Sequence, residues 1–341
     1  MVIINKSHIK LPKIEQIKLG NRMTVNQLVS ELGKAGVMGA GRISKAADIF
    51  EEMILDKRKA GKTTAKKNET EKDQAKDGCK IFLGVAGAMV PGGMKNIIID
   101  MLKNDYVDVL VVTGATLTHD MVEAIGFNHY QGSSCADDKE LFKQGIDRMY
   151  DSYMPSAVYS HLEDFFRTNI EEIKKAKNIK EFLNVLGKLV PKKNCESILS
   201  VCYDKKIPLF CPGIADSGIG LMVYNLLASG KESNKIKIDV FDDLREMMDI
   251  AWETKKAGVI YVGGGLPKNY IQQAMQLSPN PAVFGIQITM DRPEHGGSSG
   301  ASLVEGISWG KMKAEGKFVD VICDATIALP LILAAVKERV E

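Results

Sequence analysis

The chain has 341 residues, of which 45% are apolar and 26% charged, enough for a sizeable core in one large domain or two smaller ones. Its net charge of +2 and aromatic content of 6% give no reason to expect nucleic acid as a partner. No apolar run approaches the roughly 18 residues that span a bilayer, and the N-terminus lacks the pattern of a signal peptide, so we expect a cytoplasmic protein and no membrane contact.

The first predicted element is a helix over Arg42–Leu55, because Ile43, Phe50 and Met53 fall on one face with their apolar neighbours. The segment that follows differs: residues 57–76 hold eight Lys or Arg, three acids and no large apolar side chain. Such a segment cannot bury enough apolar surface to fold, so we predict a flexible basic loop over 57–79. A tether for an acidic partner is the alternative.

From residue 80 onward, short apolar runs alternate with amphipathic stretches. Nearly continuous apolar runs are typical of strands covered on both faces, and the alternation predicts an α/β fold with a doubly wound, mainly parallel sheet. The predicted strands are Lys80–Val85, Val107–Thr113, Ile207–Cys211, Ile236–Val240, Val259–Val262, Ala282–Ile288 and Phe318–Cys323. The predicted helices are Met94–Lys103, His119–Ile125, Ile219–Ala228, Asp242–Lys256, Tyr270–Leu277, Leu303–Lys311 and Thr326–Val340.

Residues 138–203 interrupt this alternation with a mainly helical insertion, which we expect to cover the same domain. The chain is therefore predicted to form a single domain over 1–341. None of the six cysteines forms a CxxC pair, and the five histidines are scattered, so no metal site is expected.

Glycine-rich segments follow most of the predicted strands, where ligands bind in open parallel sheets. They begin at Gly84, Thr113, Cys211, Gly263 and Asp291. Glycine lets backbone N–H groups approach a ligand closely, and the start of the next helix favours anionic groups. Because a turn needs fewer glycines than this, the pattern favours a large ligand such as a dinucleotide.

The standard sequence fingerprints of such sites are missing. Gly39-Ala-Gly41 has no strand before it, and no phosphate loop of the GxxxxGK[ST] type occurs. Gly296-Gly-Ser298-Ser-Gly300 matches the GxSxG pattern of hydrolases, but several loop residues separate it from its strand. We interpret it as a loop that covers a ligand.

Lys311 lies in Ile307-Ser-Trp-Gly-Lys311, at the end of a predicted helix, where a lysine is ordinarily a solvated charge. A desolvated lysine beside an aromatic wall such as Trp309 can instead lose its proton and form Schiff bases as a nucleophile. Trp309 can also hold a cationic substrate, and Glu305 can pair with an ammonium. A core tryptophan with a surface glutamate is the alternative that stays open on these grounds.

The chain resembles deoxyhypusine synthases, particularly archaeal ones, in seven segments that follow one another in the same order: FLGVAGAMVPGG, VTGATLTHD, CPGIADSGIG, GGGLPKN, HGGSSGA, ISWGK and CDAT. The match runs from about Met23 to Val336, and SWGK is its most specific part. The resemblance implies a Rossmann-like NAD site and a homotetramer with sites shared between subunits. It implies transfer of the aminobutyl group of spermidine, through a lysine imine, to a lysine of the hypusine-bearing translation factor.

The resemblance also implies roles for individual residues. Lys311 is the implied catalytic nucleophile. The implied substrate-binding residues are Trp309, Glu305, Lys268, Asn269, His119 and Ser298. The implied NAD-binding residues are Gly87, Ala88, Pro91, Thr113, Gly114, Ala115, Asp216, Gly264, Met290, Asp291, Asp324 and Ala325.

The departures from the family pattern cluster around the amine substrate. Leu221, Ser298 and His295 stand where the pattern has acids, and Asn269 stands where it has a histidine. A lost carboxylate removes a partner for a polyamine ammonium, and asparagine cannot transfer a proton as histidine can. His119 and Glu294 are the candidates for compensation.

Two other functions remain open from the sequence. The same half-reaction could pass the aminobutyl group to a small amine, as in homospermidine synthesis. A non-catalytic NAD-binding scaffold is the other, although a scaffold has no need for Lys311, Trp309 and Glu305 together.

Overall fold

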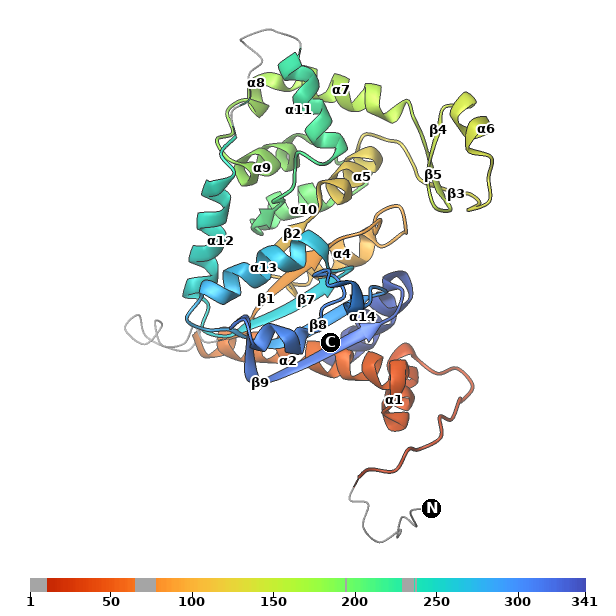
Figure 1. Ribbon diagram of the computed structural model, residues 1–341, viewed down its shortest axis with the longest axis vertical. Coiled ribbons are helices and arrows are strands. Elements are labelled where there is room, and N and C mark those ends of the chain that lie inside the picture. Colours follow the sequence, from red (N-terminus) through yellow and green to blue (C-terminus); the bar gives the residue numbers. More distant parts are fainter. Residues whose placement is uncertain (1–10, 65–77, 194, 229–235, 237) are drawn as a thin grey trace.

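The computed structural model describes residues 11–64, 78–193, 195–228, 236 and 238–341. Its centre is a six-stranded sheet in which every neighbouring pair of strands is parallel, as predicted. In spatial order the strands are β6 (Leu209–Phe210), β2 (Val109–Val112), β1 (Lys80–Val85), β7 (Ala257–Val262), β8 (Ala282–Thr289) and β9 (Met312–Ile322). Figure 1 shows the sheet running through the lower half of the molecule.

The order of the strands reverses between β1 and β7. The chain adds β2 and β6 on one side of β1, and then adds β7, β8 and β9 in turn on its other side. This is the strand order of doubly wound sheets that bind ligands at the reversal, beyond the carboxyl ends of the two central strands. The crevice next to Val85 and Val262 is therefore the expected ligand position.

Helices cover both faces of the sheet, which explains why its strands are apolar throughout. Along β1, Ile81 and Leu83 belong to one buried cluster and Phe82 to the other. The first cluster is completed by α2 (Met38–Thr64), α4 (Lys95–Lys103) and α14 (Ala325–Val340), and the second by α12 (Phe241–Glu253) and α13 (Gly265–Leu277).

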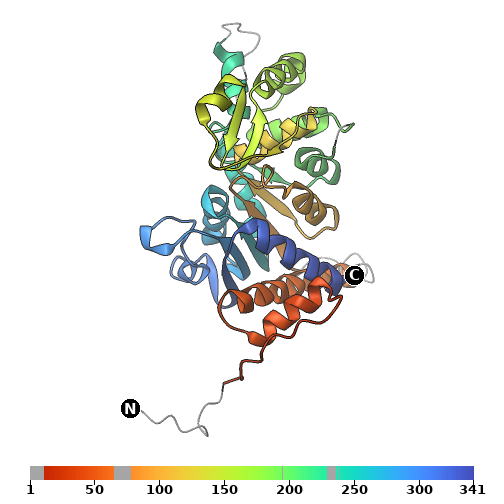
Figure 2. The ribbon, with the colours of Figure 1, turned by 90° about the vertical axis from the view of Figure 1, so that its right-hand side faces the viewer.

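The N-terminal helices pack against the last helix. Thr24 and Gln27 form a capping box at the start of α1 (Val25–Ala35), which ends at Gly36 with a left-handed φ of 68°. Arg339 of α14 donates to Asn26 across 2.6 Å. Figure 2 shows α1, α2 and α14 side by side at the base of the molecule.

The remaining helices lie mainly in the upper half of Figure 1. They are α5 (Gly114–Ala124), α6 (Asp138–Lys143), α7 (Val158–Thr168), α8 (Ile170–Ile173), α9 (Ile179–Leu189), α10 (Ile198–Lys205) and α11 (Gly218–Ala228), with two 3₁₀ helices, η3 (Pro293–His295) and η4 (Leu303–Ile307), elsewhere. Within the described residues, no helix is both long and apolar enough to cross a bilayer. The same residues contain no group of three His, Cys, Asp or Glu side chains placed to hold a metal ion.

Several predicted elements need correction. Ile236–Val240 was predicted as a strand, but its described residues form only an isolated bridge from Asp239 to Asn178, because α12 begins directly afterwards. The predicted helix Leu303–Lys311 is a 3₁₀ helix that ends at Ile307, since Gly310, with a φ of 69°, turns the chain into β9.

The two predicted irregular segments are also partly regular. Helix α2 continues to Thr64, so residues 57–64 of the predicted loop are helical, and 65–77 lie outside the described residues. The predicted helical insertion at 138–203 contains two strands as well. These are β4 (Ile146–Met149) and β5 (Ser152–Pro155), which form an antiparallel sheet with β3 (Tyr130–Gln131).

Candidate active site

The glycine-rich segments after β1, β7 and β8 meet at the carboxyl-terminal edge of the sheet. A Cβ atom added at Gly263 would lie 2.6 Å from the carbonyl oxygen of Ala86, and one at Gly264 would lie 2.7 Å from the Cα atom of Ser299. Three consecutive glycines, 263–265, have φ values of 60–74°, which side chains rarely tolerate. These glycines are therefore required for the close approach of three loops at the reversal of the sheet.

The other strand ends join the same edge. A Cβ at Gly92 would lie 3.2 Å from Thr326, which places the loop after β1 beside the start of α14. A Cβ at Gly114 would lie 2.5 Å from Ser217, so the end of β2 also meets the loop after β6. The residues predicted to bind NAD all lie on these strand ends: Gly87, Ala88, Pro91, Thr113, Gly114, Ala115, Asp216, Gly264, Met290, Asp291, Asp324 and Ala325.

Asp324 caps a helix at this edge through one oxygen, and its other oxygen has no hydrogen-bond partner among the described residues. Its Oδ1 accepts the backbone N–H and the hydroxyl of Thr326, each at 2.7 Å, and so caps α14. The side chain is exposed, as is that of Asp216. Two exposed carboxylates that follow strands can accept hydrogen bonds from ribose hydroxyls, as the family resemblance implies.

Lys311 belongs to a second group of residues, on the chain between β8 and β9. Its Nζ lies 4.8 Å from the centroid of the Trp309 ring, within the range of a cation–π contact. Trp309 is 57% exposed and Glu305 in η4 is also exposed. The backbone carbonyl of Lys311 accepts a 3.1 Å hydrogen bond from the N–H of Ala282, the first residue of β8. The backbone of Lys311 therefore lies at the amino-terminal edge of the sheet, opposite the glycine-rich segments.

Lys268 connects the two groups. It is only 1% exposed, and its ammonium donates to the carbonyl oxygens of Ser298 (2.6 Å) and Ala301 (2.5 Å) in the loop that leads to Lys311. Burial lowers the pKa of Lys268 to about 8, although the charges of Asp320 and Glu305 act in the opposite direction. Lys268 was predicted to contact the substrate. In the structure its ammonium holds the glycine-rich loop in place through two backbone carbonyls.

The four departures from the family pattern lie at different places. Leu221 is 53% exposed on α11, and Asn269 is half-buried next to Lys268. Ser298 is exposed in the glycine-rich loop, where Nδ1 of His295 accepts a 3.3 Å bond from the N–H of Gly297. None of these four side chains supplies a carboxylate to an ammonium group.

His119 lies in α5 and is part of a chain of polar side chains that was not predicted from the sequence. Its Nδ1 is 2.9 Å from Nε2 of His129, whose Nδ1 is 2.9 Å from Glu123. Glu123 forms an ion pair with the buried Lys95. The spacing of His119 and Glu123 in the sequence places them one helical turn apart and was the available signal, but His129 comes from the loop after the helix.

A pocket of about 550 Å³ adjoins both His129 and the loop after β1. It lies between residues 90–93 and the β3–β5 strands, and Ser152 donates a 3.2 Å bond to the carbonyl of Pro91 across it. The wall of this pocket includes two acidic residues, Glu123 and Asp151. This hollow is large enough for a small organic ligand and is next to the residues predicted to bind NAD.

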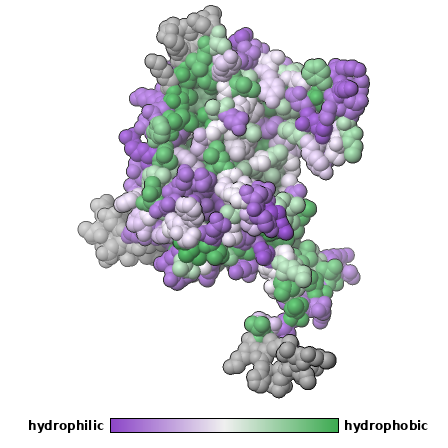
Figure 3. All heavy atoms as spheres, in the orientation of Figure 1, coloured by the Kyte–Doolittle hydropathy of each residue, from purple (hydrophilic) through white to green (hydrophobic). Residues whose placement is uncertain are grey.

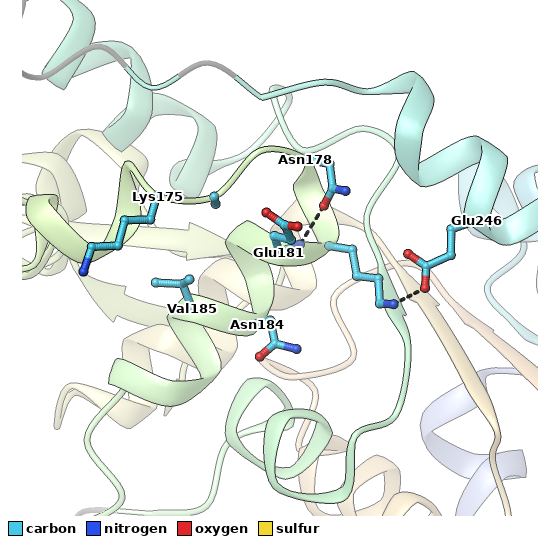
Figure 4. Close-up of a pocket in the computed structure, with 8 residues that line it drawn as sticks. Lys175, Asn178, Glu181, Asn184, Val185 and Glu246 are labelled. Atoms are coloured by element: carbon cyan, nitrogen blue, oxygen red, sulfur yellow. Dashed lines mark hydrogen bonds and ion pairs between the residues drawn. The ribbon is translucent and has the colours of Figure 1, made fainter.

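A second pocket, of about 380 Å³, lies between α9 and α12 (Figure 4). Its wall includes Asn178, Glu181 and the ion pair between Lys180 and Glu246. No residue predicted for the active site lines this pocket. The charges of Lys180 and Glu246 neutralise each other, so neither is left to bind a charged ligand. The geometry therefore favours the glycine-rich edge as the active site.

Comparison with known proteins shows the family of the chain. Residues 27–336 match the sequence model of the family described as deoxyhypusine synthase. The chain belongs to the deoxyhypusine synthase family. It is 41% identical over 327 residues to "Probable deoxyhypusine synthase 1" of Methanosarcina mazei, which covers 96% of this chain and 95% of that protein. It is 33% identical over 337 residues to "Probable deoxyhypusine synthase" of Methanothermobacter thermautotrophicus, covering 98% of each.

The fold of the deoxyhypusine synthase family is also found among solved structures. A crystal structure of an Entamoeba histolytica protein assigned as a deoxyhypusine synthase superposes with a TM-score of 0.58 at 18% identity, covering 92% of this chain and 93% of that one. At this identity the match supports the fold alone. Membership of the deoxyhypusine synthase family identifies the chain as a transferase.

Proposed function

We propose that the protein synthesises deoxyhypusine by NAD-dependent transfer of the aminobutyl group of spermidine to a lysine of the hypusine-bearing translation factor. Family membership over residues 27–336 supports the reaction class. The single observation that carries the mechanism is the ammonium of Lys311, which lies 4.8 Å from the centroid of the Trp309 ring. The proposed location of the reaction is the cytoplasm.

The residues of the glycine-rich edge fit NAD. The amino-terminal end of α13 favours an anionic group such as a pyrophosphate, and Asp216 and Asp324 offer carboxylates to ribose hydroxyls. NAD, when bound, would supply a hydride acceptor and later the hydride donor. The residues Thr113–Ala115 and Met290–Asp291 would flank it.

Lys311 would carry the aminobutyl group between the two hydride transfers. Oxidation of spermidine removes a hydride and a proton and leaves an imine carbon. The neutral amine of Lys311 adds to that carbon, 1,3-diaminopropane leaves, and the butyl group stays on Lys311 as a new imine. The acceptor lysine then displaces Lys311 in the same way, and reduction of the last imine gives the product.

The protein would act as a homotetramer. In one chain Trp309 and Glu305 face solvent, whereas imine chemistry needs a pocket from which water is excluded. The chain also exposes Leu221, Tyr224 and Leu227 on one face of α11, and Figure 3 shows apolar side chains gathered over this helix. A neighbouring subunit would cover such a surface.

One observation favours a second candidate, transfer to a small amine. Leu221, Ser298 and His295 replace acids of the family pattern, so the amine pocket has lost partners for ammonium groups. Each lost partner weakens binding by about 1–3 kcal/mol if the contact is desolvated. The sequence therefore supports aminobutyl transfer more strongly than it supports spermidine as the donor or a protein lysine as the acceptor.

The test is an assay with NAD and spermidine labelled in the aminobutyl group, with and without the translation factor. We expect label on a lysine of the factor; label in a small polyamine alone would replace this proposal with the second candidate. Borohydride should trap a labelled imine on the enzyme, and Lys311→Ala should abolish trapping. Lys313→Ala, two residues further along β9 and exposed, is the matched control and should trap normally. Absence of both trapped label and diaminopropane would exclude catalysis.

A further inference from the structure

His119, His129 and Glu123 form a continuous hydrogen-bonded chain beside the glycine-rich edge. The two distances that connect them are both 2.9 Å. The side chains of His129 and Glu123 are 6% and 23% exposed, and His119 is half-buried. Among the described residues, Nε2 of His119 has no hydrogen-bond partner, so the chain has one open end.

The charges of this chain are balanced without either histidine. Lys95 pairs with Oε2 of Glu123 and also donates to Cys195 at 3.3 Å. Burial raises the pKa of Glu123, but hydrogen bonds from His129 and Lys95 outweigh it and leave the pKa lowered. Glu123 is therefore a carboxylate at neutral pH, with one oxygen directed to Lys95 and the other to His129.

Burial, together with the neighbouring His129, lowers the pKa of His119 to about 4. His119 by itself would hold a proton poorly at neutral pH. His129, in contrast, lies directly against the carboxylate of Glu123, which stabilises an imidazolium. A proton that enters at His119 can therefore pass to His129, whose other ring nitrogen faces a carboxylate.

We infer that His119, His129 and Glu123 are a proton relay that serves the oxidation of the amine substrate. In its resting state, Nδ1–H of His129 donates to Glu123 and Nδ1–H of His119 donates to Nε2 of His129. The substrate ammonium gives its proton to Nε2 of His119 as the Nδ1–H bond of His119 breaks and a new N–H bond forms at Nε2 of His129. His119 stays neutral throughout, and His129 becomes an imidazolium paired with Glu123.

This inference rests on the proposed function, which creates the need for a base. An ammonium must lose a proton before its α-carbon can lose a hydride, because the lone pair forms the new C=N bond. Asn269, half-buried beside Lys268, cannot accept a proton. Of the other described histidines, His161 on α7 and His295 in the glycine-rich loop are both exposed. The relay is the one hydrogen-bonded pair of histidines in the described residues.

The pocket next to β3 and β5 gives the relay an exit. Glu123 and His129 both line its volume of about 550 Å³, so a proton held there can pass to solvent when the amine has left. The other titratable groups on the elements around the relay are Asp120 in α5, Lys95 in α4, Cys195 before α10, and Tyr159 and His161 in α7, and of these Lys95 bonds to Glu123 directly. Helix α11 also packs on α5 but carries no charged residue.

The test measures reduction of NAD by spermidine as a function of pH, without the acceptor protein. His119→Ala should slow reduction about 100-fold or more, and added imidazole should restore part of the rate. Glu123→Gln keeps an oxygen for His129 but removes the charge, so the pH at which the rate is half-maximal should fall by about one unit. The affinities for NAD and spermidine, measured by direct titration, should change less than about threefold, because the relay acts on the chemical step and not on binding. His161→Gln is the matched control and should match the wild type.

Two further measurements keep the outcome clear. Glu123→Gln leaves Lys95 buried without its partner, so the double variant Lys95→Met, Glu123→Gln removes both charges together. It should show a smaller fall in the pH midpoint, because the positive charge that opposes protonation of the relay is lost as well. Nitrogen NMR of the histidine rings at neutral pH should show the Nδ1–H tautomer at both His119 and His129, as the resting state of the relay requires. A wild-type enzyme that reduces NAD while the His119→Ala variant keeps its rate and midpoint would overturn the relay alone. A wild type that produces no NADH would overturn the proposed function and the relay with it.

Discussion

The ammonium of Lys268 lies 2.6 Å from the carbonyl oxygen of Ser298, and this bond joins the start of α13 to the glycine-rich loop before Lys311. A second carbonyl, that of Ala301, accepts from the same ammonium at 2.5 Å. No carboxylate among the described residues bonds to this buried cation directly. Lys268 therefore holds the loop through two hydrogen bonds, and burial of its charge opposes this gain in stability.

The stability of the protein should depend on pH through Lys268. Its pKa is about 8 in the folded state, against 10.5 for a free lysine, so the unfolded chain binds more protons between these values. The free energy of unfolding of the wild type, relative to Lys268→Met, should rise by about 1–3 kcal/mol from pH 8 to 10.5. Urea unfolding at several pH values measures this difference. Lys139→Met, at an exposed position in α6, should give a flat difference; a flat result for Lys268→Met as well would contradict the assignment.

Gly264→Ala should disrupt the edge at which the glycine-rich loops meet. Its φ of 74° is unfavourable for alanine, and the new Cβ would lie 2.7 Å from Ser299. We expect a loss of about 3 kcal/mol in stability and weaker NAD binding, measured by thermal unfolding and by titration with NAD. Gly296→Ala is the comparison, because Gly296 has a φ of 71° and a ψ of 5° in the left-handed helical region, whereas Gly264 has a ψ of −119°, and because a Cβ at Gly296 would meet nothing within 4 Å. It should lose only about 1 kcal/mol; equal losses would mean that neither the collision with Ser299 nor the ψ of −119° at Gly264 matters.

Asp324 allows capping and cofactor binding to be separated. Asparagine caps helices as well as aspartate does, so Asp324→Asn should keep stability within about 0.5 kcal/mol, whereas Asp324→Ala should lose about 1 kcal/mol. Both variants lose the charged acceptor proposed for a ribose hydroxyl, so NAD affinity should fall about tenfold in each. Calorimetric titration with NAD and chemical unfolding give the two quantities. Normal NAD affinity in Asp324→Asn would remove Asp324 from the proposed site.

Trp309 should matter for the amine and not for the fold. Its ring is 57% exposed and lies 4.8 Å from the ammonium of Lys311, so few core contacts depend on it. Trp309→Leu should raise the KM for spermidine about tenfold, because a cation–π contact in a desolvated pocket is worth about 1–2 kcal/mol. Thermal unfolding should change little. Phenylalanine keeps an aromatic face, so Trp309→Phe should recover part of the affinity; equal losses in both variants would argue against the cation–π contact.

The sequence predicted best those elements whose burial is set by the sheet itself. Lys80–Val85 was predicted to the residue, because a strand between two others is apolar throughout. The small β3–β5–β4 sheet was missed, since Tyr130 and Gln131 are exposed and its strands have two to four residues. Ile236–Val240 has the apolar residues of a strand, but α12 begins immediately after it.

The candidate site was predictable where the backbone forms it and less so where side chains from distant segments meet. The sequence predicted that glycines such as 263–265 let a ligand approach the backbone, and the structure shows that Gly263 and Gly264 have positive φ values and lie close to Ala86 and Ser299 of neighbouring loops. The pairing of His119 with His129 depends on how the loop after α5 returns to the helix, which no local spacing specifies. The position of Lys268 under the glycine-rich loop likewise depends on the packing of two segments 30 residues apart.

The central position of β1 also has a consequence for synthesis of the chain. Lys80 begins to pair with Ala257 only after roughly 180 further residues have been made, which takes about 10–35 s at ribosomal rates of about 5–20 residues per second. During that time β2 and β6 can pair on one side, while the other edge of β1 has no partner strand. An unpaired apolar edge invites association with other chains, so the nascent protein is most exposed to aggregation before β7 emerges.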